Sequence, residues 1–296
     1  MDKFKGTGVA LVTPFNLNGK VDYNGLQKLV EFQIKNGTNY LVVQGTTGES
    51  VTLSVEEKIA VLDYIIEINA GRLPILLGVG GNNTSAVCES IKFFSNYKID
   101  GFLSVSPYYN KPSQEGIYEH FKCISNASNL PIIIYNVPGR TSSNIYSDTT
   151  VKLAKDFKNI IGVKEASGNL EQIMRIILKK PDNFLVISGD DALTLAHILV
   201  GGDGVISVVA NAFPKRFSTM VDAALNQNLD LAKEKHYELF EIIHYLFVDG
   251  NPAGIKYLLK LINICSDFVR LPLVGIKEET AKKLYKLTAS IDDTLV

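Results

Sequence analysis

The most informative residue for chemistry in this chain is a lysine at the end of an apolar run. Lys164 closes the run Ile160-Ile161-Gly162-Val163-Lys164, and lysine is rarely buried without a partner or a purpose. One interpretation is an ion pair with Glu165 or another nearby carboxylate. The other is an amine that forms an imine with a carbonyl substrate, because burial favours the neutral, nucleophilic form of an amine.

An enzyme that forms an imine also needs groups that move protons. Tyr135 ends the run Pro131-Ile132-Ile133-Ile134-Tyr135, and we expect this run to be the strand next to the one that ends in Lys164. A phenol can donate and accept a proton, and Thr47 could hydrogen-bond to it. The alternative for Tyr135 is a core tyrosine whose hydroxyl has an ordinary partner.

Three further features could bind a substrate or a neighbouring subunit. Thr46 and Thr47 stand between two glycines, which indicates either backbone N–H groups open to an anion or only a tight turn. Arg140 follows Tyr135 on a loop, where its planar guanidinium could bind a carboxylate or simply be solvated. Tyr108 and Tyr109 are adjacent and cannot both face one small core, so one of them could reach a subunit neighbour.

Eight short apolar runs are spaced to position these side chains. Each run is nearly continuous, which is typical of a parallel strand covered on both faces. They occupy residues 9–12, 40–43, 74–79, 101–105, 131–135, 160–164, 184–188 and 204–208. Amphipathic helical patterns lie between them, for example at 22–36, from the capping box at Ser54 onward, and at 169–180.

Eight strand–helix units predict a TIM (β/α)8 barrel, whose active site lies at the carboxyl ends of the strands. A doubly wound sheet is the alternative fold. It is less well supported, because no G-x-G-x-x-G motif follows the first predicted strand. Beyond the last strand, helical patterns occupy 214–226, 229–247, 252–263 and 277–290. We therefore expect a catalytic barrel over 1–225 and a C-terminal helical region over 226–296.

Composition excludes several classes of protein. Hydrophobic residues make up 46% and charged residues 21%, and the formal net charge is −1, so we expect a globular protein with no nucleic-acid or membrane partner. No apolar run approaches the roughly 18 residues of a membrane span, and the start of the chain has no signal-peptide pattern. A cytoplasmic location is expected.

The cysteine and histidine spacings argue against a metal or redox centre. Cys88, Cys123 and Cys265 form no C-x-x-C pair, and the four histidines form no H-E-x-x-H pattern. Phosphate binding is also not expected, because Asp190 and Asp191 follow the seventh predicted strand, close to where barrels of this type usually bind phosphate.

Five stretches of the chain resemble the signatures of the dihydrodipicolinate synthase family, also called 4-hydroxy-tetrahydrodipicolinate synthases. They are Gly45-Thr46-Thr47-Gly48-Glu49-Ser50, residues 106–116, Tyr135-Asn136-Val137-Pro138-Gly139-Arg140-Thr141, residues 162–169 and Ser188-Gly189-Asp190-Asp191. The resemblance extends over essentially the whole chain. Two departures are visible: Gly139 stands where the family usually has serine, and residues 251–256 fit the family's motif only in part.

The resemblance implies how pyruvate would be bound. Lys164 would form a Schiff base with it, and Thr46 and Thr47 would hold its carboxylate. Gly189 and the main chain of Ile206 would line the pyruvate pocket. No metal or organic cofactor is implied.

The resemblance also implies the second half of the reaction. Tyr135, Thr47 and Tyr109 would pass protons, with Tyr109 supplied by the adjacent subunit of a homotetramer built as a dimer of dimers. The enamine would attack L-aspartate 4-semialdehyde, whose carboxylate Arg140 would hold. The enzyme would be a lyase that makes 4-hydroxy-tetrahydrodipicolinate for lysine and diaminopimelate biosynthesis.

Two other functions are considered on the same barrel. An N-acetylneuraminate lyase or a 2-keto-3-deoxy sugar acid aldolase would share the imine step, but the resemblance associates Arg140 and the Thr46–Thr47 pair with the synthases. A non-catalytic pyruvate-binding regulator would be expected to lack part of the relay, whereas all of its residues are present: Lys164, Tyr135, Thr47 and Tyr109.

The resemblance further implies a regulatory site, since many family members are inhibited by lysine at the dimer interface. Sensitive members usually place a glutamate where this chain has Ala86 and a histidine where it has Lys58. An ammonium at 58 would repel the two amino groups of lysine, so we predict weak or absent inhibition; the alternative is that both positions are neutral helix-surface residues. The positions that are kept are Ser50, Asn82 and Tyr108.

Overall fold

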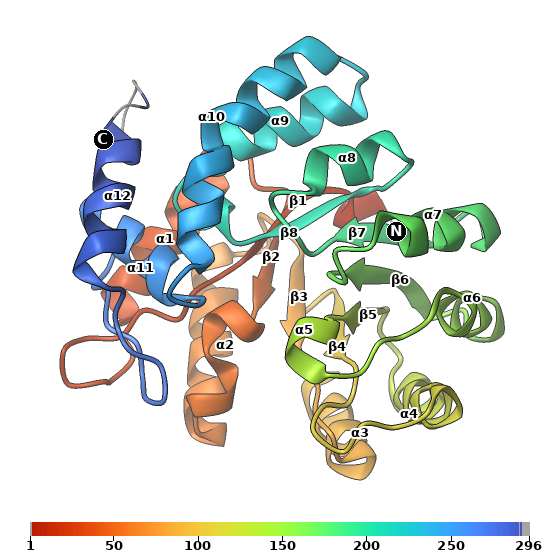
Figure 1. Cartoon of the computed structure of the whole chain (residues 1–296). Coiled ribbons are helices and arrows are strands. Elements are labelled where there is room, and N and C mark those ends of the chain that lie inside the picture. The colour runs from red at the N-terminus through yellow and green to blue at the C-terminus, as the bar shows by residue number, and fades with distance from the viewer. Residues whose placement is uncertain (1, 290, 292–296) are drawn as a thin grey trace.

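Eight parallel strands close into a barrel in the order of the sequence (Figure 1). The computed structural model describes residues 2–289 and 291. The strands are β1 (Gly6–Ala10), β2 (Tyr40–Val43), β3 (Ile75–Gly78), β4 (Gly101–Val105), β5 (Ile132–Asn136), β6 (Ile160–Glu165), β7 (Leu185–Ser188) and β8 (Gly204–Ser207). The pairing of β8 with β1 closes the ring, so the predicted (β/α)8 barrel is confirmed.

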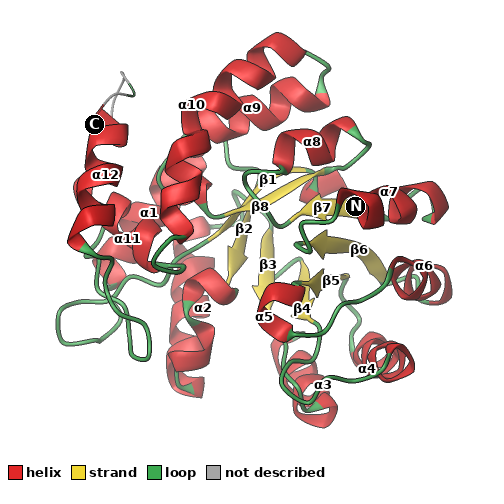
Figure 2. Cartoon of the chain, viewed as in Figure 1, coloured by secondary structure: helices red, strands yellow, loops and turns green. Residues whose placement is uncertain are grey.

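Helices surround the strands, as Figure 2 shows with helices in red outside the yellow barrel. They are α1 (Tyr23–Lys35), α2 (Val55–Asn69), α3 (Thr84–Phe94), α4 (Gln114–Ala127), α5 (Pro138–Thr141), α6 (Ser147–Asp156), α7 (Leu170–Lys179), α8 (Thr194–Leu199) and α9 (Pro214–Leu225). The predicted capping box at the start of α2 is confirmed: Ser54 Oγ accepts from the Glu57 N–H at 3.2 Å, and the Glu57 carboxylate accepts from the Ser54 N–H at 3.1 Å.

Alternate residues of each strand face two different hydrophobic clusters. In β5, Ile132 and Ile134 join the cluster between strands and helices, whereas Ile133 and Tyr135 join the cluster inside the barrel. Both faces of the strand are therefore buried, which explains why its sequence is apolar throughout instead of alternating.

The first strand begins earlier than predicted. The apolar pattern placed it at 9–12, but β1 starts at Gly6, where it pairs with Gly204 of β8. Thr7 is fully buried in the strand although it is polar, so hydrophobicity alone does not mark this start. Val12 lies beyond the strand, and its N–H donates to Asn211 Oδ1 at 3.1 Å.

Three more helices follow the barrel: α10 (Leu229–Phe247), α11 (Ala253–Leu261) and α12 (Glu278–Ala289). They form the blue part of Figure 1, where α10 packs against α9. Their apolar residues, such as Leu239 and Leu258, belong to the same core cluster as the outer faces of the strands. The helical region is thus packed onto the barrel. Residues 290 and 292–296 of this predicted region lie outside the described residues.

None of the helices in the described part of the chain has the length and apolar character that crossing a membrane requires.

Candidate active site

Lys164 and Tyr135 lie side by side inside the barrel. β5 and β6 are neighbours in the sheet, and their register places Tyr135 opposite Lys164. The Lys164 side chain is only 6% exposed, and its Nζ lies 4.3 Å from the centroid of the Tyr135 ring. The prediction that these two residues come from adjacent strands is confirmed.

Lys164 is not paired with Glu165, so that interpretation of the sequence was wrong. The Glu165 carboxylate faces the helices, where it accepts from Asn136 Nδ2 at 3.0 Å and Gln172 Nε2 at 3.0 Å. Its burial raises the pKa of the Glu165 carboxyl. Consecutive residues of a strand point to opposite faces, which separates the two side chains. Over residues 2–289 and 291, no carboxylate lies within ion-pair distance of Lys164 Nζ.

A glycine beside the lysine leaves room for its side chain. Gly189 follows β7, and a Cβ there would lie 3.0 Å from Lys164 Cε and 2.6 Å from Ala166 Cβ. Any larger residue would therefore displace the lysine or its neighbour. Ile206 of β8 is buried in the same interior cluster as Tyr135, so both residues predicted to line the pocket belong to this side of the barrel.

The loop after β2 carries the threonine pair. Thr46 and Thr47 begin a single 3-10 turn, η2 (Thr46–Gly48), in which Thr46 is exposed and Thr47 is buried. The first N–H groups of a helical turn have no carbonyl partner within it, which leaves donors at this position. The turn is tied to the barrel because Thr13 Oγ1 donates to the Gly48 carbonyl at 2.7 Å.

The same loop is held by two residues of the C-terminal helical region, Asn251 and Lys256. Asn251, between α10 and α11, donates from Nδ2 to Thr47 Oγ1 at 3.0 Å. Lys256 of α11 forms an ion pair with Glu49 in which both side chains are almost completely buried. The only sequence signal for these residues was the partial match to the family's motif at 251–256.

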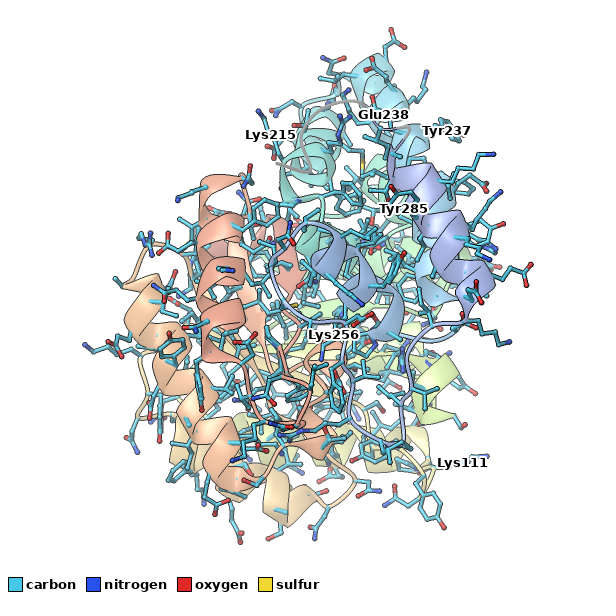
Figure 3. The ribbon with its side chains drawn as sticks, turned by 90° about the vertical axis from the view of Figure 1, so that its left-hand side faces the viewer. Lys111, Lys215, Tyr237, Glu238, Lys256 and Tyr285 are labelled. Atoms are coloured by element: carbon cyan, nitrogen blue, oxygen red, sulfur yellow. The ribbon has the colours of Figure 1, made fainter. Side chains whose placement is uncertain are left out.

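The buried pair of Lys256 and Glu49 has further contacts with the surrounding chain. Lys256 Nζ also donates to the Phe268 carbonyl at 3.0 Å and lies 4.2 Å from the centroid of the Phe15 ring. The second oxygen of Glu49 accepts from the Arg270 N–H at 2.9 Å. Burial lowers the pKa of Lys256, while Glu49 favours its charged form. Figure 3 shows Lys256 near the centre of the view and Lys111 at its edge, and the Lys256 side chain is fully buried.

Two predicted site residues are exposed in this chain, whereas Lys164 is buried. Tyr109 is 89% exposed and has a left-handed backbone (φ 70°). Arg140 is exposed on α5, which Figure 1 shows in front of β4 and β5. Within the described part of the chain, neither residue makes a hydrogen bond or ion pair with its side chain, so both are accessible to a ligand or a second subunit.

The predicted regulatory positions lie on α2, on α3 and in loops between strands and helices. Asn82 donates from Nδ2 to the Tyr108 carbonyl at 3.1 Å, while Ser50 begins the turn η3 (Ser50–Thr52). Lys58 is on α2 and half-buried, and its carbonyl accepts from Gln44 Nε2 at 2.6 Å. Ala86 is exposed on α3.

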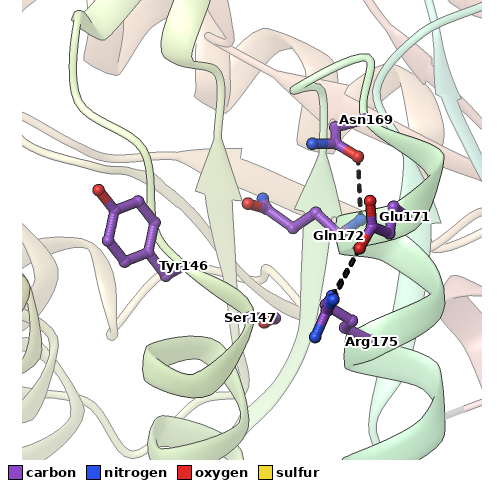
Figure 4. A pocket seen from close by; sticks show the side chains of 6 residues that line it. All are labelled: Tyr146, Ser147, Asn169, Glu171, Gln172 and Arg175. Atoms are coloured by element: carbon purple, nitrogen blue, oxygen red, sulfur yellow. Dashed lines mark hydrogen bonds and ion pairs between the residues drawn. The ribbon is translucent and has the colours of Figure 1, made fainter.

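A separate pocket of about 320 Å³ lies on the outer surface between α6 and α7 (Figure 4). Its lining includes Gln172, which bonds to the outward-facing Glu165, and the exposed ion pair of Arg175 with Glu171. The backbone of β6 separates this pocket from Lys164. We therefore place the candidate active site inside the barrel and not here.

Comparison with known proteins agrees with this geometry. The Dihydrodipicolinate synthetase family matches residues 3–291. The chain belongs to this family. A relative from Flavobacterium psychrophilum, named 4-hydroxy-tetrahydrodipicolinate synthase, is 51% identical over 291 residues, which cover 98% of this chain and 99% of that protein. The resemblance noted from the sequence motifs is confirmed.

Solved structures of the family have the same fold. The crystal structure of dihydrodipicolinate synthase from Aquifex aeolicus superimposes with a TM-score of 0.94, at 40% identity and 97% coverage of both chains. A monomeric dihydrodipicolinate synthase variant superimposes with a TM-score of 0.95, at 39% identity, covering 97% of this chain and 96% of that one. The barrel and the C-terminal helices are therefore features shared with this family.

Proposed function

We propose that this protein is a 4-hydroxy-tetrahydrodipicolinate synthase, a lyase that condenses pyruvate with L-aspartate 4-semialdehyde in lysine and diaminopimelate biosynthesis. The observation that supports this most strongly is the amine of Lys164, which is buried in the barrel beside Tyr135 and faces away from Glu165. Membership of the family and the names of relatives such as the Flavobacterium protein support the substrate assignment.

In the proposed first half-reaction, the neutral amine of Lys164 attacks the ketone carbon of pyruvate. Loss of water gives the imine, and loss of a methyl proton gives the enamine. Tyr135 and Thr47 carry the protons, while Thr46 and Thr47 bind the pyruvate carboxylate through the donors of their turn. Gly189 and Ile206 shape the pocket. No cofactor enters the scheme, because the imine itself accepts the electrons of the C–H bond that breaks when the methyl proton is lost.

In the second half-reaction, the enamine carbon attacks the aldehyde carbon of the semialdehyde, and the new alkoxide takes up a proton. The amino group of the semialdehyde then attacks the imine carbon, which closes the ring and releases the amine of Lys164. Arg140 binds the carboxylate of this substrate with its guanidinium. Its exposed position on α5 suits a residue that meets the second substrate after pyruvate is bound.

Tyr109 fits the scheme only if a second subunit is present. Its ring projects into solvent in the single chain, so we propose that it completes the relay of an adjacent subunit in a homotetramer. The similar monomeric variant shows that this fold also exists as one chain. Sedimentation at assay concentration tests the point, since a fully active monomer would contradict a shared site.

Borohydride trapping tests the proposed function directly. Reduction of the imine in the presence of pyruvate should add the mass of a 1-carboxyethyl group to one lysine, and peptide mapping should identify Lys164. Lys164→Ala should not be labelled, whereas the exposed neighbour variant Lys158→Arg should be labelled like the wild type. Absence of any adduct favours the non-catalytic regulator. Trapping together with cleavage of N-acetylneuraminate, and no condensation with the semialdehyde, would favour the sugar-acid lyase.

A further inference from the structure

A side chain from the C-terminal helical region reaches the hydroxyl of Thr47. Asn251 is 7% exposed, and its Nδ2 donates to Thr47 Oγ1 at 3.0 Å. Its other amide atom, Oδ1, has no hydrogen-bond partner among the described residues. The bond to Thr47 is thus the one polar contact that the described structure gives this side chain, and it joins the helical region to the reaction centre.

The direction of this hydrogen bond constrains the threonine hydroxyl. A hydroxyl has one proton to donate, and an NH2 group can only donate. Because Thr47 Oγ1 accepts from the Asn251 amide, its own proton is left for another acceptor. Thr47 is itself buried at the barrel mouth, so that acceptor lies in the interior of the site and not in bulk water.

We propose that Asn251 is a positioning residue for the reaction: it holds the Thr47 hydroxyl with its proton directed toward the tyrosine relay. This inference rests on the proposed function, in which Thr47 transfers protons. Asn251 itself contacts neither substrate in this scheme. It acts through Thr47, by fixing which partner of the relay donates and which accepts.

The surrounding structure fixes the position of Asn251 relative to Thr47. Glu49 lies two residues after Thr47, and Lys256 lies five residues after Asn251, so their buried ion pair joins the same two segments a second time. The Arg270 N–H binds the other Glu49 oxygen at 2.9 Å. Such double attachment suits a relay, since a displacement of about 1 Å can cost a hundredfold in rate.

The decisive experiment is a double-mutant cycle between Asn251→Ala and Thr47→Val, with steady-state kinetics and borohydride trapping as readouts. We expect Asn251→Ala to lower kcat about tenfold to a hundredfold, with the KM for pyruvate changed less than about threefold. In the Thr47→Val background, Asn251→Ala should cause no further loss, because residues that act as one unit are not additive. Lys260→Met, an exposed change one turn beyond Lys256, should retain wild-type kinetics.

Asn251→Asp separates orientation from packing. It fills the same space, but its carboxylate accepts where the amide donates, so we expect a kcat loss at least as large as that of Asn251→Ala. Circular dichroism and the melting temperature establish whether each variant is folded. If Asn251→Ala does not fold, Asn251→Asp is used for the test in its place.

Three results would overturn the inference. Wild-type kcat in Asn251→Ala would show that the bond to Thr47 is dispensable. Losses that multiply in the double variant, or full activity in Asn251→Asp, would show that the residue only fills space. If the wild type itself traps no pyruvate, the proposed function fails, and this inference fails with it; normal trapping with an unaffected Asn251→Ala refutes the inference alone.

Discussion

Replacement of Lys256 by methionine should destabilise this protein far more than loss of an ordinary ion pair. The substitution keeps most of the side-chain volume but removes the ammonium, while the Glu49 carboxylate stays buried. The Arg270 N–H still binds one oxygen of Glu49, so the other oxygen loses its partner. What is tested is therefore the cost of an uncompensated buried charge.

The magnitude follows from burial. Removing one partner of a buried ion pair typically costs about 3–5 kcal/mol. The double variant Lys256→Met/Glu49→Gln removes both charges and leaves only a buried amide that lacks one partner, at a cost of about 1–3 kcal/mol. The double variant should therefore be more stable than the single variant, although it carries more changes.

Urea unfolding at pH 7, followed by circular dichroism, gives the free energies of unfolding for the comparison. Lys260→Met is the matched control, because it removes an ion pair with Asp267 whose side chains are 56% and 35% exposed; it should cost no more than about 1 kcal/mol. A Lys256→Met variant within about 1 kcal/mol of the wild type, or a double variant clearly less stable than the single one, would refute the argument.

Three further predictions concern substrate binding, regulation and pH. Arg140→Ala should raise the KM for L-aspartate 4-semialdehyde about tenfold to a hundredfold, the equivalent of one charged hydrogen bond, while borohydride trapping of pyruvate stays unchanged; an equal effect on trapping would contradict the assignment. Lysine should inhibit weakly or not at all at saturating pyruvate. The double variant Lys58→His/Ala86→Glu should be more sensitive to lysine, because it removes a repulsive ammonium at 58 and adds an attractive carboxylate at 86. Half-inhibition of the wild type at sub-millimolar lysine would disprove the charge argument. Burial raises the pKa of Asp191 from its usual 3.8 to about 6, so the group favours the folded state when protonated, and this stability is lost as the pH rises through about 6. Asp191→Asn should therefore gain up to about 3 kcal/mol relative to the wild type between about pH 4 and pH 7, and a difference in unfolding free energy that does not vary with pH would count against this.

The amino-acid sequence alone was enough to predict the barrel and the position of Lys164 beside Tyr135. A parallel strand buried on both faces must be apolar along its whole length, so the eight runs are visible without a structure, and the run 40–43 even matches β2 residue for residue. Lys164 was informative for the same reason, because a charge at the end of such a run has to lie where the barrel opens.

Local pattern was less informative where a strand or a side chain depends on its neighbours. β1 starts at Gly6 because β8 pairs with it there. Gly6, Thr7 and Gly8 are not apolar enough for a hydrophobic run to predict a strand at these positions. The sequence likewise did not predict which way the Glu165 side chain points, since its hydrogen-bond partners are Asn136 and Gln172 on the helical side of the strand. Which of two adjacent charges faces the cavity was decided by strand pleat and register.

The attachment of the helical region to the reaction centre was decided only by the tertiary structure. Asn251 and Thr47 are 204 residues apart, and Glu49 and Lys256 are 207 apart. Each member of these pairs, taken alone, is an unremarkable polar residue in a loop or helix. The contacts exist because α10 and α11 pack their apolar faces onto the barrel, and that packing brings two distant segments together at a position that no local periodicity encodes.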